Sequence, residues 1–167
     1  MRLITRNSYT NFAFGDSIRR QAIIDWKKAG NKAMVAKLSP PKLTVDFSDL
    51  GELLAAEGLY DVDIITCPPP SFHDYAKDGG WYPAEVLALA VLDPLDLPLT
   101  LLWPMTDHQK AKKIIEGNIN KIYPVPDGVR GKVVLVLDDI GTTGHTLAAC
   151  CDAICQGGGY PLGVSFV

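Results

Sequence analysis

The stretch Val133-Val134-Leu135-Val136-Leu137-Asp138-Asp139-Ile140-Gly141-Thr142-Thr143-Gly144-His145-Thr146-Leu147 decides the fold. Its first five residues are apolar and rich in β-branched side chains, which predicts a buried strand. Two adjacent carboxylates stand where that strand ends, and a turn of small and hydroxylated residues follows them. Residues 147–156 predict a helix that stops at three consecutive glycines. The unit is therefore a strand, an acid pair, a loop suited to an anion, and a helix.

This unit provides two kinds of binding group. A helix N-terminus offers unpaired N–H groups and the positive end of a dipole, and Gly141 and Gly144 let the backbone curl around one phosphate. The threonines of the turn add hydroxyl donors. Asp138 and Asp139 would repel a phosphate, but they can accept hydrogen bonds from hydroxyls or lie near a divalent cation. The layout fits a ligand with a phosphate at one end and a diol nearby, such as ribose 5-phosphate.

Length and composition limit the classes of protein to consider. The chain has 167 residues, 47% of them apolar, which predicts one globular domain over residues 1–167. A net charge of −3 argues against a broad nucleic-acid-binding face. No apolar run is long enough for a membrane span, and Met1–Thr10 lacks the apolar core of a signal peptide, so we expect a cytoplasmic protein with no membrane partner. The four cysteines lack paired C-x-x-C spacing, which favours free, mostly buried thiols over a metal site or a disulfide.

The rest of the chain alternates helices and strands. Helices are predicted over 18–28, 32–38, 48–57 and 83–92, and strands over 2–5, 62–66, 99–102, 133–137 and 163–167. The Lys-rich segment 106–116 is expected to be helical or mobile. Strands separated by helices favour a parallel sheet covered on both faces, in which ligands bind beyond the carboxyl ends of the strands. Asp138-Asp139 and Cys67–Ser71 both follow such ends, so we expect them to line one crevice.

The segment from Val133 to Leu147 resembles the phosphoribosyl-pyrophosphate (PRPP) signature of type I phosphoribosyltransferases: an apolar strand, two acids, then Thr-Thr-Gly-x-Thr. It is not a Walker A loop, because no Gly-Lys-Ser/Thr follows. The resemblance implies an α/β fold of three layers (α/β/α) with a parallel sheet and a reduced hood. It also implies a transferase that binds PRPP with Mg²⁺ and passes the phosphoribosyl group to a nitrogen acceptor such as a nucleobase. The alternative is a well-capped strand–turn–helix unit without a ligand.

The resemblance also implies a role for each site residue. Asp138 and Asp139 would be the catalytic pair and would meet the ribose hydroxyls. The 5′-phosphate would lie on the loop, whose residues are Ile140, Gly141, Thr142, Thr143, Gly144, His145 and Thr146. The pyrophosphate would meet Cys67, Pro68 and Lys77. Mg²⁺ would bridge pyrophosphate and ribose with few protein ligands, and the acid pair would be the nearest of these.

Outside the signature, the order of segments is similar to the ComF-type branch, which is associated with DNA uptake. The likeness rests on Phe14-Gly15-Asp16-Ser17-Ile18-Arg19 through Trp26-Lys27, on Asp63-Ile64-Ile65 with Cys67-Pro68-Pro69-Pro70, and on Thr106-x-x-Gln109 with Asn118. Two arginines of that branch are missing. Gly79-Gly80-Trp81-Tyr82 stands in place of Arg-Gly-Phe-Asn, and Glu116-Gly117 precedes Asn118. Because both arginines would lie near the pyrophosphate, their loss favours the alternative function, a non-catalytic protein that binds PRPP or a nucleotide in DNA uptake or regulation.

Several parts of this reading stay open. Lys110, Lys112 and Lys113 either close over the leaving group as a lid or form a solvated face. The aromatic residues that could stack on an acceptor base are Trp81, Tyr82, Trp103 and Tyr123, although each alone fits a packing role better. The sequence does not separate orotate, a purine, uracil and a non-base amine as acceptors. A homodimer and a phosphate-binding domain within a larger assembly are further open alternatives.

Overall fold

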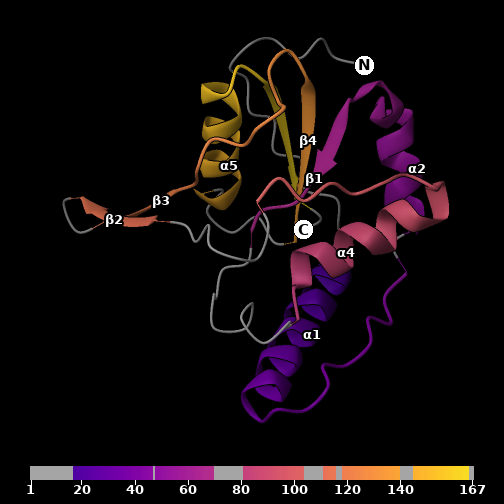
Figure 1. Ribbon diagram of the computed structural model, residues 1–167. Helices are drawn as coiled ribbons and strands as arrows, with labels where there is room; N and C mark the ends of the chain where they lie inside the picture. The colour runs from indigo at the N-terminus through magenta and orange to yellow at the C-terminus, as the bar shows by residue number, and fades with distance from the viewer. Residues whose placement is uncertain are drawn as a thin grey trace.

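The computed structural model describes residues 17–46, 48–69, 81–103, 111–115, 118–139 and 145–165. Within these ranges the chain forms an α/β fold around a parallel sheet of three strands (Figure 1). The strands are β1 (Ile64–Thr66), β4 (Val133–Asp138) and β5 (Tyr160–Ser165), in the spatial order β1-β4-β5. β4 is the central strand of this sheet, and its residues Val136 and Asp138 lie opposite Thr66 of β1 and Ser165 of β5.

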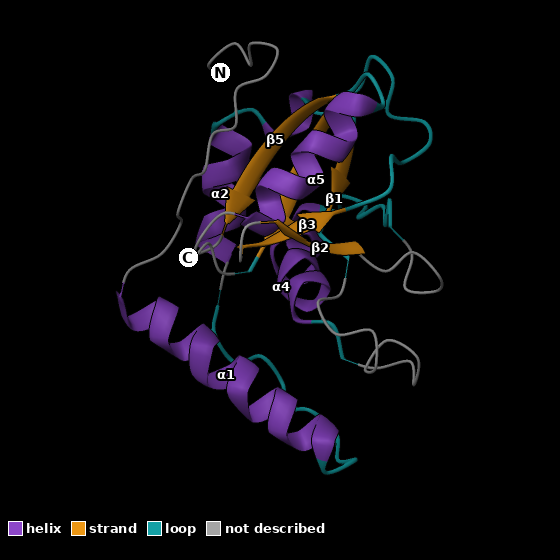
Figure 2. Cartoon of the chain, turned by 90° about the vertical axis from the view of Figure 1, so that its left-hand side faces the viewer, coloured by secondary structure: helices purple, strands orange, loops and turns teal. Residues whose placement is uncertain are grey.

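Helices cover both faces of the sheet (Figure 2). The helices on one face are α2 (Ser48–Ala56) and α4 (Pro83–Leu92), and α5 (His145–Gln156) lies on the other, while α1 (Ser17–Val35) lies beyond the carboxyl ends of the strands and packs against the core on the α2 and α4 side. The pleat of β4 explains this division, because successive side chains of a strand point to opposite faces. Leu135 and Leu137 join the core with α1, α2 and α4, whereas Val134 and Val136 join the core with α5.

The predicted centre of the fold is confirmed. The predicted helix over 83–92 coincides with α4, which has a proline at its first position. The strand predicted over 133–137 and the helices predicted over 48–57 and 147–156 match β4, α2 and α5 to within two residues. Strong local patterns, namely an apolar run and a run of glycines after the helix, set these elements. The strand predicted over 2–5 lies outside the described residues.

The division of the first helix was predicted wrongly. Two helices were expected, over 18–28 and 32–38, but α1 is continuous through Gly30. Gly30 is buried, and a Cβ atom there would lie 2.3 Å from the ring of Trp81. This glycine therefore permits a close approach of the helix to Trp81 rather than ending the helix. Trp81 also meets Trp26 edge-on, with ring centroids 5.0 Å apart.

The strand predicted over 99–102 is not a strand of the sheet. It is an extended segment that follows the outer edge of β1 in the same direction. The backbone N–H of Thr100 donates to the carbonyl oxygen of Ile65 over 2.8 Å, and the N–H of Leu102 donates to the hydroxyl of Thr66 over 3.4 Å. Too few backbone hydrogen bonds form here for a ladder, because Pro98 at its start has no N–H to donate. Two short 3₁₀ helices, Leu59–Asp61 and Asp93–Leu95, complete the connections on this side.

The Lys-rich segment was expected to be helical or mobile, and this was wrong for its carboxyl half. β2 (Ala111–Ile115) pairs antiparallel with β3 (Asn118–Ile122), and Ile114 lies opposite Ile119. The hairpin extends to the side of the α5 layer (Figure 1). Isoleucine favours strands, and this preference outweighs the polar lysines beside it.

The described residues include all four cysteines and the buried Trp26. All four cysteines are free thiols, three of them buried and Cys155 partly exposed, which confirms the prediction. Trp26 is buried in the core, as predicted, and its indole N–H donates to the carbonyl oxygen of Pro41 over 3.0 Å. No helix among the described residues combines the length and apolar character that a membrane crossing requires.

Gly30→Ala should destabilise the fold, although alanine is the better helix former by roughly 1 kcal/mol. The added methyl group cannot fit without moving the Trp81 ring, so we expect a net loss of about 1–3 kcal/mol in the free energy of unfolding, measured by urea denaturation. In a Trp81→Leu background the same substitution should be neutral or stabilising. An equal loss in both backgrounds would rule out the contact as the cause.

Candidate functional site

The candidate site is built on the acid pair at the end of the central strand. Asp138 is the last residue of β4 and Asp139 follows it, and both are buried, at 7% and 8% exposure. The backbone N–H of Asp139 donates to a carboxylate oxygen of Asp138 over 2.8 Å. The alternation of β4 directs Asp138 to the side of Val136 and α5. Such burial is rare for aspartates without a partner, so each carboxylate needs a compensating group.

α1 supplies the compensating cation for Asp139. The Lys27 Nζ lies 2.5 Å from the Asp139 Oδ2, and the two side chains are 29% and 11% exposed. A pair this far from water is screened less by salt than an exposed ion pair. The sequence reasoning did not identify Lys27 as a site residue. One available signal is that Lys27 stands four residues after the buried Ile23, on the inward side of the helix.

Asp138 is compensated differently. Burial raises the pKa of Asp138 well above its usual range, and the neighbouring Asp139 raises it further. The backbone N–H of Asp139 and the charge of Lys27 oppose this rise without cancelling it. The two carboxyl groups therefore divide into one that is ion-paired and one that holds its proton tightly.

The turn after β1 lies beside the acid pair, as predicted. Cys67 and Pro68 are buried and directly follow Thr66, which pairs with Val136 two residues before Asp138. Burial, together with smaller contributions from nearby carboxylates that include the acid pair, raises the pKa of Cys67 to about 12. Cys67 is therefore a neutral thiol rather than a thiolate nucleophile. Pro68 has no N–H, so this turn offers few donors to an anion.

Two buried tyrosines, Tyr82 and Tyr123, flank the region of the acid pair from different core clusters. Tyr82 precedes α4 and Tyr123 follows β3; both are buried, and neither hydroxyl makes a well-formed hydrogen bond among the described residues. The Tyr82 hydroxyl lies near the Cys67 thiol, and the Tyr123 hydroxyl faces Thr146. Burial raises the pKa of both tyrosines well above the usual range, and the shared neighbours Cys150 and Asp138 add to the shift. A buried hydroxyl without a hydrogen-bond partner is rare in a folded protein, so these two tyrosines are uncommon features of the core.

The four aromatic candidates for base stacking all pack inside the protein. Tyr82, Trp103 and Tyr123 are buried, and Trp81 is half-buried against Trp26. The indole N–H of Trp103 donates to the carbonyl oxygen of Pro124 over 2.9 Å, and its ring lies 5.8 Å from that of Tyr123 between centroids. These contacts favour packing roles, so the acceptor-binding surface stays unassigned.

Several predicted site residues cannot be placed. Residues 140–144 of the loop, together with Lys77 and Lys110, lie outside the described residues. His145 begins α5, two residues earlier than predicted, and Thr146 is half-buried in its first turn. The helix therefore begins six residues after the end of the acid pair, which leaves the intervening loop short. Lys112 and Lys113 belong to β2, where Lys112 lies opposite Lys121.

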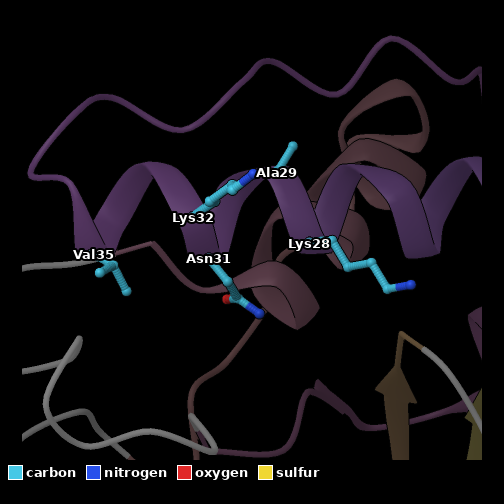
Figure 3. A pocket seen from close by; sticks show the side chains of 5 residues that line it. All are labelled: Lys28, Ala29, Asn31, Lys32 and Val35. Carbon is cyan, nitrogen blue, oxygen red and sulfur yellow. The ribbon is translucent and has the colours of Figure 1, made fainter.

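A hollow of about 650 Å³ lies along the carboxyl-terminal half of α1 (Figure 3). Its lining residues are Lys28, Ala29, Asn31, Lys32 and Val35. Lys27 and the acid pair do not line it, so the hollow is not the candidate site itself. Asn31 stands one helical turn beyond Lys27, so the hollow lies along the part of α1 that follows the ion pair.

Comparisons with known proteins leave the family open. No protein-family model matches the chain, and no curated protein matches it. The crystal structure of a hypothetical protein from Neisseria gonorrhoeae with bound ppGpp is similar over 97% of this chain and 73% of that chain, at 14% identity and a TM-score of 0.45. A likeness this distant identifies neither a family nor a ligand, so the site has to be interpreted from its own residues.

Asp138→Asn should change how stability depends on pH. Because the pKa of Asp138 in the folded protein is above the unfolded value of about 4, the folded state keeps this proton longer. The contribution of Asp138 to stability is therefore present at low pH and is lost as pH rises through the raised pKa. Without the titrating group, the variant should gain on the order of 1–3 kcal/mol over the wild type between pH 4 and pH 8, measured by urea denaturation. The exposed Asp93→Asn is the matched control, and identical profiles for both variants would contradict the assignment.

Tyr82→Phe should cost no stability. A buried hydroxyl without a partner carries a desolvation penalty, and its removal should be neutral or stabilise the protein by about 0–1 kcal/mol. Trp103→Phe provides the contrast, because it removes a donor that has a partner and should destabilise the protein. Thermal unfolding would measure both variants. A clear loss in Tyr82→Phe would show that its hydroxyl is bonded.

Proposed function

We propose that this chain is a phosphoribosyltransferase that binds PRPP with Mg²⁺ and transfers the phosphoribosyl group to a nitrogen acceptor such as a nucleobase. The observation that carries the proposal is the buried acid pair at the carboxyl end of the central parallel strand, with the Gly/Thr loop and α5 directly after it. Buried carboxylates are costly to the fold, and this edge of a parallel sheet is where ligands bind. The pair is therefore better explained by ligand binding than by core packing.

The same reasoning supports a type I phosphoribosyltransferase fold of three layers with a reduced hood. The helices on both faces of the sheet and the extended segment beside β1 are compatible with such a fold. We also propose a cytoplasmic location, which the free thiols favour because disulfides form in oxidising compartments.

In the proposed reaction the chain binds and orients rather than attacking the substrate. Asp138 and Asp139 accept hydrogen bonds from the ribose hydroxyls, and residues 140–146 with the N-terminus of α5 hold the 5′-phosphate. The bond from C1 of the ribose to pyrophosphate breaks, and its electron pair leaves with the pyrophosphate. The lone pair of the acceptor nitrogen forms the new bond to C1, and the nitrogen loses its proton to water. The carboxylate of Asp139, once Lys27 has turned away from it, stabilises the positive charge that builds on the ribose ring.

The described residues fit Mg²⁺ only as an ion that the ligand carries. Carboxylate oxygens are the ligands that Mg²⁺ prefers, but Asp139 is engaged by Lys27, and no group of three acidic, histidine or cysteine residues gathers in the described part of the chain. Asp138 and Asp139 would be the nearest protein groups to an ion that the ligand brings. Bound in this way, Mg²⁺ would neutralise part of the charge on the leaving group.

The residues that would receive the pyrophosphate favour a second function. The two arginines of the ComF-type branch are missing, and Pro68 and Pro69 bring no N–H groups to the turn after β1. Removing one hydrogen-bond donor to a negative charge that develops in the transition state typically lowers the reaction rate by a factor of about 10²–10³. These features favour a ComF-like protein that binds PRPP or a nucleotide without turnover, in DNA uptake or regulation.

Calorimetric titration with PRPP, ribose 5-phosphate and inorganic pyrophosphate, each with and without Mg²⁺, tests binding. We expect Mg²⁺-dependent binding of PRPP. Thr143→Val should weaken ribose 5-phosphate by about 1.5–3 kcal/mol, because it removes a hydroxyl donor to a charged phosphate. Thr44→Val, at an exposed position before α2, is the matched control. Absence of PRPP binding would overturn both functions and leave a phosphate-binding domain of other purpose.

Pyrophosphate release separates the two functions. Release would be followed with orotate, uracil, adenine, guanine and hypoxanthine as acceptors. Rapid release with any one of them supports the transferase. PRPP binding with no release above the rate without acceptor supports the non-catalytic protein.

A further inference from the structure

We propose that Lys27 is an exchangeable cation, which pairs with Asp139 until a ligand arrives and then moves to the diphosphate group of that ligand. This inference rests on the proposed function and deepens it, because it assigns the anion-binding side of the site to α1. Lys27 is then a positioning residue that favours ligands with a diphosphate group.

The backbone of α1 is held while the Lys27 side chain can turn. Ile23 and Trp26 are buried in the core, and Arg19 pairs with Asp49 of α2 over 2.9 Å. The Lys27 side chain is 29% exposed, so part of it already reaches solvent. A lysine carries its charge on a flexible four-carbon stem with three donors, so it can change partners without movement of the helix.

The exchange follows because Lys27 and the ribose hydroxyls compete for the carboxylate of Asp139. The Asp139 Oδ2 accepts from Lys27, and the proposed ribose hydroxyls need the same carboxylate. A hydroxyl that takes this position leaves the ammonium partly buried without an anion, which is costly. A diphosphate on the same ligand supplies a stronger anion nearby. Ligand binding and release of Lys27 are therefore coupled.

The rest of the described site gives the diphosphate few alternatives. Cys67 is a neutral thiol, and the prolines that follow it have no N–H to donate. The hollow along α1 begins one turn from Lys27, and Figure 3 shows Lys28 and Asn31 directed to the same side of the helix. Lys28 and Lys32 therefore add positive charge to the part of α1 that follows Lys27.

Lys27→Ala should affect the two halves of PRPP in opposite directions. With Mg²⁺ present, we expect this substitution to weaken the binding of inorganic pyrophosphate and of PRPP at least tenfold, because the ammonium group that pairs with the diphosphate is lost. Ribose 5-phosphate should bind as well as to the wild type or severalfold more tightly, because Lys27 no longer competes for the Asp139 Oδ2. Calorimetric titration would measure all three ligands. Lys42→Ala removes the same charge from an exposed position after α1 and should change none of the affinities.

Asp139→Asn breaks the same ion pair from its other side and keeps the inference testable if Lys27→Ala does not fold. This variant should lose affinity for ribose 5-phosphate and keep or gain affinity for pyrophosphate, because Lys27 is then unpaired. Lys27→Arg retains the charge and should keep most of the pyrophosphate affinity. The exchange is overturned, while the proposed function stands, if the wild type binds PRPP and either variant changes both affinities equally. The two affinities compared are those for pyrophosphate and for ribose 5-phosphate, and the variants are Lys27→Ala and Asp139→Asn. If the wild type binds no PRPP, both the proposed function and the exchange are overturned.

Discussion

Two consecutive carboxyl groups at the buried end of β4 are the constraint on which the rest of the structure depends. An unpaired ion in a protein interior costs several kcal/mol, and two adjacent like charges raise that cost. Asp139 is compensated by Lys27, and Asp138 by the backbone N–H of Asp139 and by a tightly held proton. The end of the sheet is therefore close to electrically neutral, although its sequence places two acids side by side.

The position of α1 follows from this requirement. Lys27 can reach Asp139 only if the middle of α1 lies near the carboxyl end of the sheet. Trp26, the edge of Trp81 and the absence of a side chain at Gly30 together permit that approach. Few other residues of α1 are buried, and Ile18 at its start is 80% exposed. The helix is thus held by a short aromatic contact and two ion pairs rather than by a long apolar face.

The elements with strong local patterns could be predicted from the sequence, and those that depend on tertiary contacts could not. The apolar run of β4 and the proline that starts α4 are local, so their positions were correct. Gly30 resembles a helix end until Trp81 is known to lie against it. The hairpin was hidden because its lysines suggested a solvated helix. The acid pair and the turn at Cys67 were placed together correctly, since parallel strands share one carboxyl edge. Lys27 was missed because no local pattern links the middle of one helix to the end of a distant strand.

The ion pair also bears on which molecules this site can accept. A neutral sugar offers hydroxyls to the acid pair but brings no anion to receive Lys27, so its binding would leave a partly buried ammonium unpaired. An anion without hydroxyls can attract Lys27, but it leaves the Asp139 carboxylate without its partner. Only a ligand that joins hydroxyl donors to an anion satisfies both groups at once, because a ligand shifts an equilibrium only through interactions that differ between the two states. Under the proposed exchange the site would therefore discriminate by the combination of groups on one molecule, and specificity would arise from the cost of separating Lys27 from Asp139 without replacing both partners.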